Sequence, residues 1–167
     1  MSCCENPRVV VLMGSESDWD TMQRTHKVLA DFGVPHVCRV LSAHRTPDLL
    51  AAFVKETEAK GAEVFIAGAG LAAALPGAVA ALTAKPVLGV PIQAGALNGH
   101  DALLAMAQMP PGIPVATLAI GTPGATNAGL LAVAILGNKY PEYAEKLNAY
   151  RKSQADKIAG TKLPCEC

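Results

Sequence analysis

The chain has 167 residues and no formal net charge at pH 7, and hydrophobic residues make up 51% of it against 17% that are charged. This length suits one domain with a full hydrophobic core, whereas two domains would be crowded. Because positive charge is not in excess, the composition excludes proteins that hold nucleic acid or an anionic membrane surface by charge. A small neutral or anionic ligand fits better.

The chain alternates short apolar runs, each typical of a buried parallel strand, with longer segments whose apolar residues recur at helical spacing. Strands are expected at residues 8–13, 36–41, 63–67, 86–90 and 115–120. Helices are expected at residues 18–32, 47–60, 101–107 and 124–136. Regular alternation of this kind predicts a parallel sheet with helices on both faces, in a flavodoxin-like three-layer α/β/α sandwich.

Residues 141–157 differ from the rest because they are charged and amphipathic, with aromatic residues near helical spacing. They predict an appended C-terminal helix, which could pack on its own domain or reach a neighbouring subunit. No internal repeat or linker suggests a second domain. We expect a single domain over residues 1–167, with a core at about 8–137 and flexible tails at 1–6 and 160–167.

Two features bear on the location of the protein. Residues 64–84 carry no charged side chain, but glycines and a proline interrupt them and alanine dominates, which disfavours a membrane span. The first seven residues lack the basic and apolar regions of a secretory signal. We therefore expect a cytoplasmic protein that does not enter a membrane.

Charge is scarce in the second half of the chain, where Asp101 is the only charged residue between Pro86 and Asn138. A monomer of this size would have difficulty hiding so much apolar surface. This half is therefore expected to line both the core and a contact between subunits of a homo-oligomer.

The cysteines form two groups. Cys38 lies within an expected strand and is interpreted as a buried strand residue, whose thiol would stay reduced in the cytosol. The terminal residues Cys3, Cys4, Cys165 and Cys167 could bind zinc if the two ends met, but their spacing matches no zinc finger or ribbon. Solvated tails are the preferred interpretation, and no metal site is predicted.

The most informative stretch is residues 42–47, Ser-Ala-His-Arg-Thr-Pro. Thr46 and Pro47 are typical of an N-cap and a first helical residue, so the preceding residues should lie on a strand-to-helix connection. His44 is the candidate proton-transfer residue and Arg45 the candidate anion clamp. The alternative is that His44 only caps the helix or pairs with a carboxylate.

The loops that follow successive parallel strands meet at one edge of an open sheet, where ligands bind. That edge should collect residues 14–18, 42–45 and 68–76 and the loop after Val90. The first of these loops offers small residues, two hydroxyls and a helix N-terminus, which suit a phosphate or ribose hydroxyls. Asp18 could instead be only a helix cap.

Several separate segments together resemble the class I phosphoribosylaminoimidazole carboxylase family, the N5-carboxyaminoimidazole ribonucleotide mutases of purine biosynthesis. The segments are Met-Gly-Ser-Glu-Ser-Asp-Trp-Asp-Thr-Met (13–22), Ser-Ala-His-Arg-Thr-Pro (42–47), Ile-Ala-Gly-Ala-Gly (66–70), Leu-Pro-Gly (75–77) and Gln-Met-Pro-Pro-Gly-Ile-Pro-Val-Ala-Thr (108–117). The resemblance implies a flavodoxin-like subunit, a homo-octamer, a ribonucleotide substrate and no metal or organic cofactor. It also implies a functional link to the ATP-dependent synthetase that makes the substrate.

The resemblance also implies roles for individual residues. His44 matches the family's proton-transfer histidine, while Ser15, Asp18 and Arg45 match its nucleotide-binding residues. The remaining expected substrate-binding residues lie beside these or in the third loop, and they are Ser17, Ser42, Ala43, Gly68, Ala69, Gly70 and Leu75.

The third motif departs from the family pattern, which usually reads Gly-Ala-Gly-Gly-Ala-Ala-His-Leu-Pro-Gly. Residues 68–77 here carry Leu71 in place of a glycine and Ala74 in place of the histidine. Leucine restricts the backbone, and loss of the imidazole removes a polar group from the expected CO2 pocket. His100, expected on a neighbouring loop, is a possible substitute, although a lone loop histidine is more often simply solvated.

These observations leave four hypotheses. A mutase is favoured, with a class II carboxylase that uses free CO2 as the related enzymatic alternative. The altered positions Leu71 and Ala74 also allow a degenerate paralogue that binds a ribonucleotide without turnover. A flavin-binding module is possible from the fold alone, but fold does not fix function.

Overall fold

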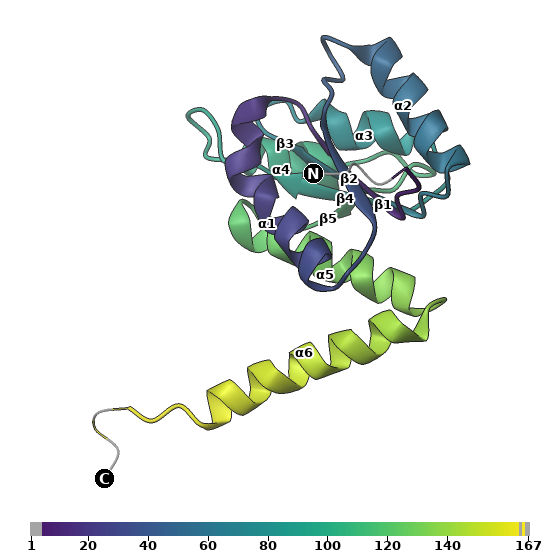
Figure 1. Cartoon of the computed structure of the whole chain (residues 1–167). Coiled ribbons are helices and arrows are strands. Elements are labelled where there is room, and N and C mark those ends of the chain that lie inside the picture. Colours follow the sequence, from purple (N-terminus) through teal and green to yellow (C-terminus); the bar gives the residue numbers. More distant parts are fainter. Residues whose placement is uncertain (1–4, 164, 166–167) are drawn as a thin grey trace.

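The computed structural model describes residues 5–163 and 165, and its centre is a parallel sheet in the order β2-β1-β3-β4-β5 (Figure 1). The strands are β1 (Val9–Met13), β2 (His36–Val40), β3 (Val64–Ala69), β4 (Val87–Pro91) and β5 (Ala116–Thr117). The order places β2 and β5 at the two edges and changes direction beside β1, which is the topology expected of a flavodoxin-like sheet.

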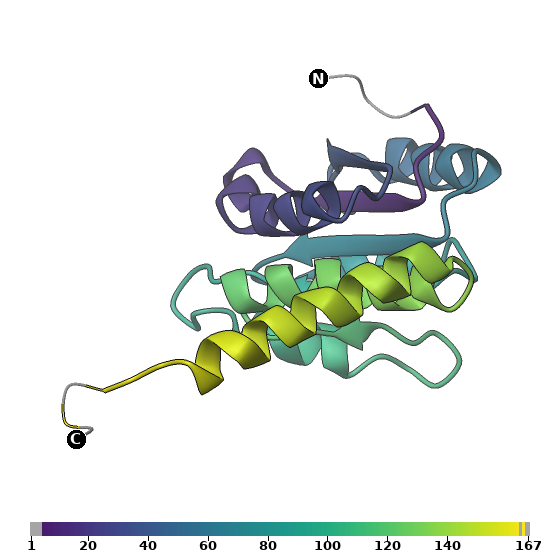
Figure 2. The same cartoon turned by 60° about the horizontal axis from the view of Figure 1, so that its bottom comes forward.

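Helices cover both faces of this sheet, as the alternation predicted (Figures 1 and 2). The helices are α1 (Trp19–Asp31), α2 (Pro47–Ala59), α3 (Ala74–Ala80), α4 (His100–Ala107), α5 (Thr122–Gly137) and α6 (Pro141–Ala159), with a 3-10 turn, η1, at Glu16–Asp18. One core cluster joins the sheet to α1, α5 and α6, and the other joins it to α2, α3 and α4. The expected three-layer sandwich is confirmed.

Strand β1 is a continuous apolar run because both of its faces are covered. Val9, Val11 and Met13 face the cluster under α1 and α5, whereas Val10 and Leu12 face the cluster under α2 and α3. All five side chains are buried. A strand covered on both faces cannot alternate apolar with polar residues, so the run of valines is what a central parallel strand requires.

The appended helix packs on its own domain with its first half and extends past the domain with its second (Figure 2). Tyr143 and Leu147 are buried in the cluster under α5, and Lys146 Nζ donates to the carbonyl of Phe32 at 2.8 Å. Residues 151–159 are all exposed. The first half of α6 therefore packs on its own domain, whereas the second half remains exposed.

A small polar cluster fixes the start of α6 against the sheet. The Tyr140 hydroxyl donates to Glu63 Oε1 at 2.7 Å, and Lys139 Nζ lies 2.9 Å from Glu63 Oε2. Partial burial by itself raises the pKa of Glu63, but the hydrogen bonds from Lys139 and Tyr140 outweigh it and hold that pKa below its usual value. The carboxylate stays charged because its partners remain in place.

The third strand is confirmed, but its end and the turn after it differ from the prediction. Strand β3 extends to Ala69, so Gly68 and Ala69 belong to the strand and not to a glycine-rich turn. A Cβ at Gly68 would lie 2.5 Å from Met22 Sδ, so the glycine lets α1 lie close to the sheet. Helix α3 was missed because it contains Pro76 and Gly77, which are tolerated in a first turn whose amides need no intrahelical partner.

The fifth strand is much shorter than expected. Only Ala116–Thr117 pair with β4, although the Leu118 amide still donates to the Gly89 carbonyl at 2.9 Å. Farther on, the chain turns so that the backbone of Ala119 lies against Gly124 in the first turn of α5. His100 is the first residue of α4 rather than part of a loop.

The other expected strands and helices are confirmed, with boundaries that differ by one or two residues. No helix in the described ranges is both long enough and apolar enough to cross a membrane. Cys3, Cys4 and Cys167 lie outside the described residues, as do parts of both expected tails, while Cys165 is described and exposed.

Helices α1 and α5 pack closely at Gly129, and this generates a prediction about stability. A Cβ at Gly129 would lie 2.8 Å from Val28 Cβ. We expect Gly129→Ala to destabilise the fold by about 1–3 kcal/mol through overpacking, measured by urea unfolding. Asn127→Ala, at an exposed position of the same helix, is the control and should leave stability unchanged or slightly higher. A stabilised Gly129→Ala protein would contradict the close packing.

Candidate functional site

The loops after β1 and β2 meet at the carboxyl edge of the sheet. Met13 is in register with Val40 on one side and with Gly68 on the other, so β1 and β2 end at the same level and β3 ends one residue farther on. The Arg45 guanidinium donates to the Gly14 carbonyl at 2.7 Å, which ties the second loop to the first. The sequence predicted this convergence, and the structure places both loops in contact.

The second loop is held by bonds within itself. The Thr46 hydroxyl accepts from the Ser42 amide at 2.9 Å and donates to the Ser42 carbonyl at 3.0 Å. The Ser42 hydroxyl in turn accepts from the backbone amide and from Nε of Arg45. Thr46 occupies the expected N-cap position before Pro47, but its hydroxyl closes the loop instead of capping α2.

The first loop is closed in a similar way around Asp18. The Ser15 amide donates to Asp18 Oδ2 at 3.0 Å, and the Ser17 hydroxyl donates to the Ser15 hydroxyl at 3.1 Å. Burial raises the pKa of Asp18, against the opposing effects of the Ser15 and Gly14 amides and of the Arg45 charge. Because it accepts from the Ser15 amide, the Asp18 carboxylate caps the start of η1. It also interacts electrostatically with the Arg45 guanidinium.

His44 is exposed and lies on the second loop, next to Arg45 in the sequence. Across residues 5–163 and 165, no hydrogen bond or ion pair ties its imidazole to a carboxylate or to a helix end. The alternative that His44 merely caps α2 or pairs with an acid is thus not supported. An exposed imidazole beside a guanidinium and two hydroxyl-bearing loops can accept and donate protons to a bound ligand.

The third loop contains the two positions at which this chain departs from the pattern of the family that it resembles. Leu71 has a positive φ of 56° and its side chain is 55% exposed, so a bulky residue holds a left-handed conformation that favours glycine. Its Cδ2 lies 2.8 Å from where a Cβ on Gly95 would stand, so the leucine lies against the loop after β4. Ala74 begins α3 and is half-buried.

The remaining expected binding residues differ in what they can offer a ligand. Gly68 and Ala69 are buried in β3, and the side chain of Leu75 is packed in the core at 3% exposure. Gly70 lies at the end of the strand, where a Cβ would be 2.9 Å from Ala94 Cβ. Any contact of these residues with a ligand would therefore involve the backbone more than the side chains.

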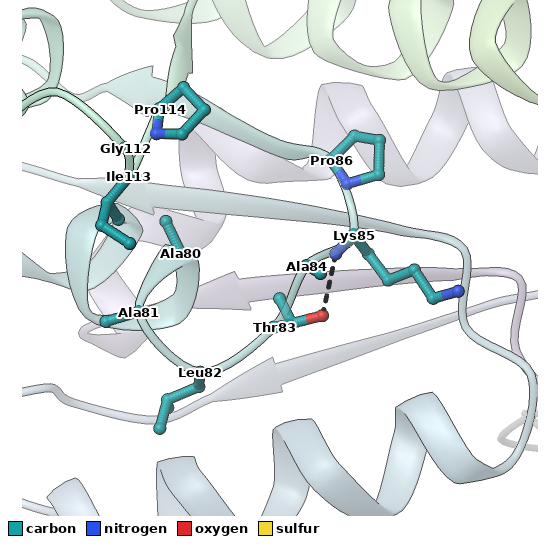
Figure 3. A pocket seen from close by; sticks show the side chains of 10 residues that line it. All are labelled: Ala80, Ala81, Leu82, Thr83, Ala84, Lys85, Pro86, Gly112, Ile113 and Pro114. Atoms are coloured by element: carbon teal, nitrogen blue, oxygen red, sulfur yellow. Dashed lines mark hydrogen bonds between the residues drawn. The ribbon is translucent and has the colours of Figure 1, made fainter.

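A separate hollow of about 620 Å3 lies at the amino ends of β4 and β5 (Figure 3). It is lined by small and apolar side chains with one lysine: Ala80, Ala81, Leu82, Thr83, Ala84, Lys85, Pro86, Gly112, Ile113 and Pro114. The sequence did not point to this hollow. Because ligands of open sheets bind at the carboxyl ends of strands, it does not replace the site built on the other edge.

The side chains at the carboxyl edge suit an anionic nucleotide better than a metal. They comprise hydroxyls, one guanidinium, one imidazole and the carboxylates of Glu16 and Asp18, and the Asp18 carboxylate is already bonded to a backbone amide. Phosphate groups match a guanidinium with neighbouring hydroxyl and amide donors. Within the described chain, the only group of side chains with metal-ligand spacing lies apart from this site, in α1 and β2.

Comparisons with known proteins agree with this arrangement. Over 150 residues the chain is 54% identical to the N5-carboxyaminoimidazole ribonucleotide mutase of Pseudomonas aeruginosa, covering 90% of this chain and 92% of the relative. It is 53% identical to part of the bifunctional purine synthesis protein purC/E of Dictyostelium discoideum, covering 92% of this chain and 15% of that protein.

Structure and family comparisons extend the match to the fold. The crystal structure of Treponema denticola PurE superposes with a TM-score of 0.83 at 31% identity, covering 90% of this chain and 93% of that one. Residues 8–157 match the family described as AIR carboxylase. The chain therefore belongs to the AIR carboxylase family.

Proposed function

We propose that this protein is an N5-carboxyaminoimidazole ribonucleotide mutase of purine biosynthesis. The observation that carries the proposal is 54% identity over 90% of the chain to a relative of that name. The enzyme would move a carboxylate from the exocyclic N5 nitrogen of the substrate to carbon C4 of its imidazole ring. No further reactant is consumed, because the reaction is an isomerisation.

The carboxyl-edge loops are proposed to hold the nucleotide. Arg45 offers a bidentate donor to a phosphate, and the hydroxyls of Ser15, Ser17 and Ser42 lie within the same two loops. Asp18 would accept from a ribose hydroxyl through the carboxylate oxygen that does not bond the Ser15 amide. Ala43 and the backbone of residues 68–70 would complete the walls.

His44 is proposed to move the protons. The carbamate of the substrate loses CO2 while its nitrogen takes up a proton, which leaves aminoimidazole ribonucleotide and trapped CO2. Carbon C4 then attacks that CO2, and the proton on C4 must leave to restore the aromatic ring. One imidazole can donate the first proton and accept the second, so it returns to its starting state.

Two alternatives predict different outcomes in the same assay. The mutase should convert N5-carboxyaminoimidazole ribonucleotide to the C4-carboxylated product, and should be far less active with aminoimidazole ribonucleotide and bicarbonate. A class II carboxylase should show the reverse preference, and no comparison favours it. A binding-only paralogue should retain nucleotide binding with neither reaction.

An oligomer is proposed on the basis of the apolar surface. The charge-poor half of the chain exposes large apolar side chains, namely Leu97, Leu104, Ile113 and Leu131. We propose a single-domain subunit in a homo-octamer, acting in the cytoplasm on a small-molecule substrate without a metal or organic cofactor. Functional linkage to the ATP-dependent synthetase that makes the substrate is also proposed, and the bifunctional relative supports linkage of this family to another purine-synthesis activity.

His44→Asn should lower turnover by at least about 100-fold, because a general acid/base of this kind contributes about 10²–10⁴-fold. Nucleotide affinity, measured by calorimetry, should be nearly unchanged since Arg45 and the hydroxyls remain. His100→Asn is the matched control, because His100 is exposed and bonded to the Leu97 carbonyl, and it should retain full turnover. Normal turnover of His44→Asn would contradict the proposed role.

Arg45→Lys should weaken binding of the ribonucleotide, because an ammonium group cannot copy the paired donors of a guanidinium. Arg45→Ala should weaken it further. Calorimetry with the dephosphorylated nucleoside should show a much smaller loss for both variants. Equal losses for nucleotide and nucleoside would show that Arg45 does not bind the phosphate.

The double variant Leu71→Gly/Ala74→His tests whether the altered motif is a lesion. We expect turnover to stay level or fall, because His44 supplies the proton transfer and a new half-buried imidazole would need a partner. Leu71→Gly alone should not destabilise the fold, since glycine removes the left-handed strain, whereas Leu71→Ala retains it. A large rise in turnover of the double variant would show that the unmodified pocket is impaired.

A further inference from the structure

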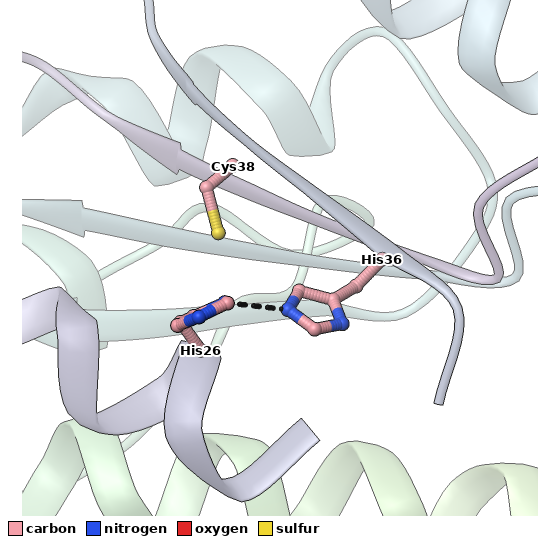
Figure 4. A group of neighbouring side chains, drawn as sticks. All are labelled: His26, His36 and Cys38. Atoms are coloured by element: carbon pink, nitrogen blue, oxygen red, sulfur yellow. Dashed lines mark hydrogen bonds between the residues drawn. The ribbon is translucent and has the colours of Figure 1, made fainter. Parts of the chain in front are cut away.

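A cluster of two histidines and one cysteine lies between α1 and the edge strand β2, away from the proposed substrate site. His26, His36 and Cys38 each offer one ligand atom, and these atoms all lie within 4.8 Å of one another (Figure 4). All three residues are half-buried. The carboxyl-edge function described above uses none of them.

The side-chain periodicities of β2 and α1 explain why these three residues meet. His36 and Cys38 are two residues apart on β2 and therefore face the same side of the sheet, toward α1. The intervening Val37 packs in the opposite core cluster, under α2 and α3. His26 lies one turn after the buried Met22 on α1, which brings its ring to the seam beside the edge strand.

Hydrogen bonds fix the tautomer of His36. Its Nδ1 lies 2.7 Å from the Val34 carbonyl, which can only accept, so Nδ1 must carry a proton. In the neutral ring, Nε2 then holds a lone pair and accepts from His26 Nδ1 at 2.8 Å. A backbone carbonyl behind a histidine, with the other ring nitrogen available to a metal, is the usual arrangement around metal-binding imidazoles.

We propose that His26 Nδ1, His36 Nε2 and Cys38 Sγ form a binding site for Zn2+. Three ligands of this type, with water in the fourth position, give a tetrahedral zinc site. Figure 4 shows the cysteine sulfur directed toward the two rings. The inference does not rest on the mutase proposal, because it concerns a different part of the molecule.

The distances require only local adjustment. With zinc bonds of about 2.0–2.1 Å to nitrogen and about 2.3 Å to sulfur, tetrahedral ligand atoms stand roughly 3.3–3.6 Å apart. The two nitrogens, now 2.8 Å apart, must therefore separate by about half an ångström, whereas a pair at the 4.8 Å limit of the cluster must approach by about 1.2 Å. On binding, Cys38 releases its thiol proton to solvent, and His26 exchanges its Nδ1 proton for one on Nε2.

The electrostatic surroundings favour the neutral imidazole that a metal needs. Burial lowers the pKa of His36, with a further lowering from His26, and the Val34 carbonyl only partly offsets this. Trp19, the sole tryptophan of the chain, lies with its ring centre 5.7 Å from that of His26. An open-shell ion such as Co2+ in the cluster would therefore be close enough to quench tryptophan emission.

The test uses the full-length chain, free of affinity tags, with Cys3, Cys4, Cys165 and Cys167 changed to serine so that Cys38 is the only thiol. Co2+ is titrated as a spectroscopic substitute for zinc. We expect a thiolate-to-cobalt absorption band and quenching of Trp19 emission, both saturating at one equivalent per chain. Added Zn2+ should remove the band.

Variants distinguish specific coordination by these three residues from nonspecific metal binding. Cys38→Ser should abolish the band. His26→Gln keeps an amide that can still donate to His36. It should weaken metal affinity by more than about 100-fold, which is more than the loss of an outer-shell partner causes. His100→Gln, at an exposed histidine on α4, should leave affinity unchanged. Circular dichroism confirms that each variant is folded.

Three outcomes would overturn the proposal. The first is a folded cysteine-reduced protein that gives no band at one equivalent of Co2+. The second is a His26→Gln protein that binds as tightly as its parent. The third is weak binding without saturation, which would mean that the histidines form only a hydrogen-bonded pair.

Discussion

The parallel register of β2, β1 and β3 is the constraint on which the rest of the structure depends. Met13 stands level with Val40 and with Gly68, so β1 and β2 end at one height and β3 ends one residue farther on. Loops that carry hydroxyls, a guanidinium and an imidazole are thereby delivered to a single edge. The apolar run of β1 holds this register, because its side chains are buried on both faces of the sheet and a slip would expose them.

Contacts between the loops convert that convergence into a site. Arg45 reaches the Gly14 carbonyl, and the Ser42 hydroxyl holds the backbone and side chain of Arg45 in place. The guanidinium is therefore oriented before a ligand arrives, which reduces the entropy lost on binding. His44 is left exposed beside it, in a position to reach a bound ligand. The proposed function therefore assigns binding and proton transfer to adjacent residues of one short loop.

Local sequence patterns predicted most of the fold. They were insufficient where tertiary contacts determine the boundaries of an element. The valine run of β1 and the Thr46–Pro47 helix start are explained by local chemistry. Helix α3 was hidden by its own proline and glycine. The glycine at position 68 of the chain, in β3, is explained by the close approach of Met22, which is far away in the sequence. At the site, the residue types of the two loops were predictable, but the Arg45–Gly14 bond and the positive φ of Leu71 depend on tertiary structure that no local pattern reveals. The cluster of His26, His36 and Cys38 went unrecognised because its ligands come from two elements and match no familiar spacing.

The fate of the migrating carboxylate tests the central claim most directly. N5-carboxyaminoimidazole ribonucleotide labelled with 13C at its carboxylate would be converted in a large excess of unlabelled bicarbonate, and the C4-carboxylated product examined by mass spectrometry. If the site traps CO2 beside the nucleotide, as the mutase assignment requires, most of the product carries the label. Product that has lost its label to the bicarbonate pool would contradict the account, because CO2 would then be exchanging freely with solvent.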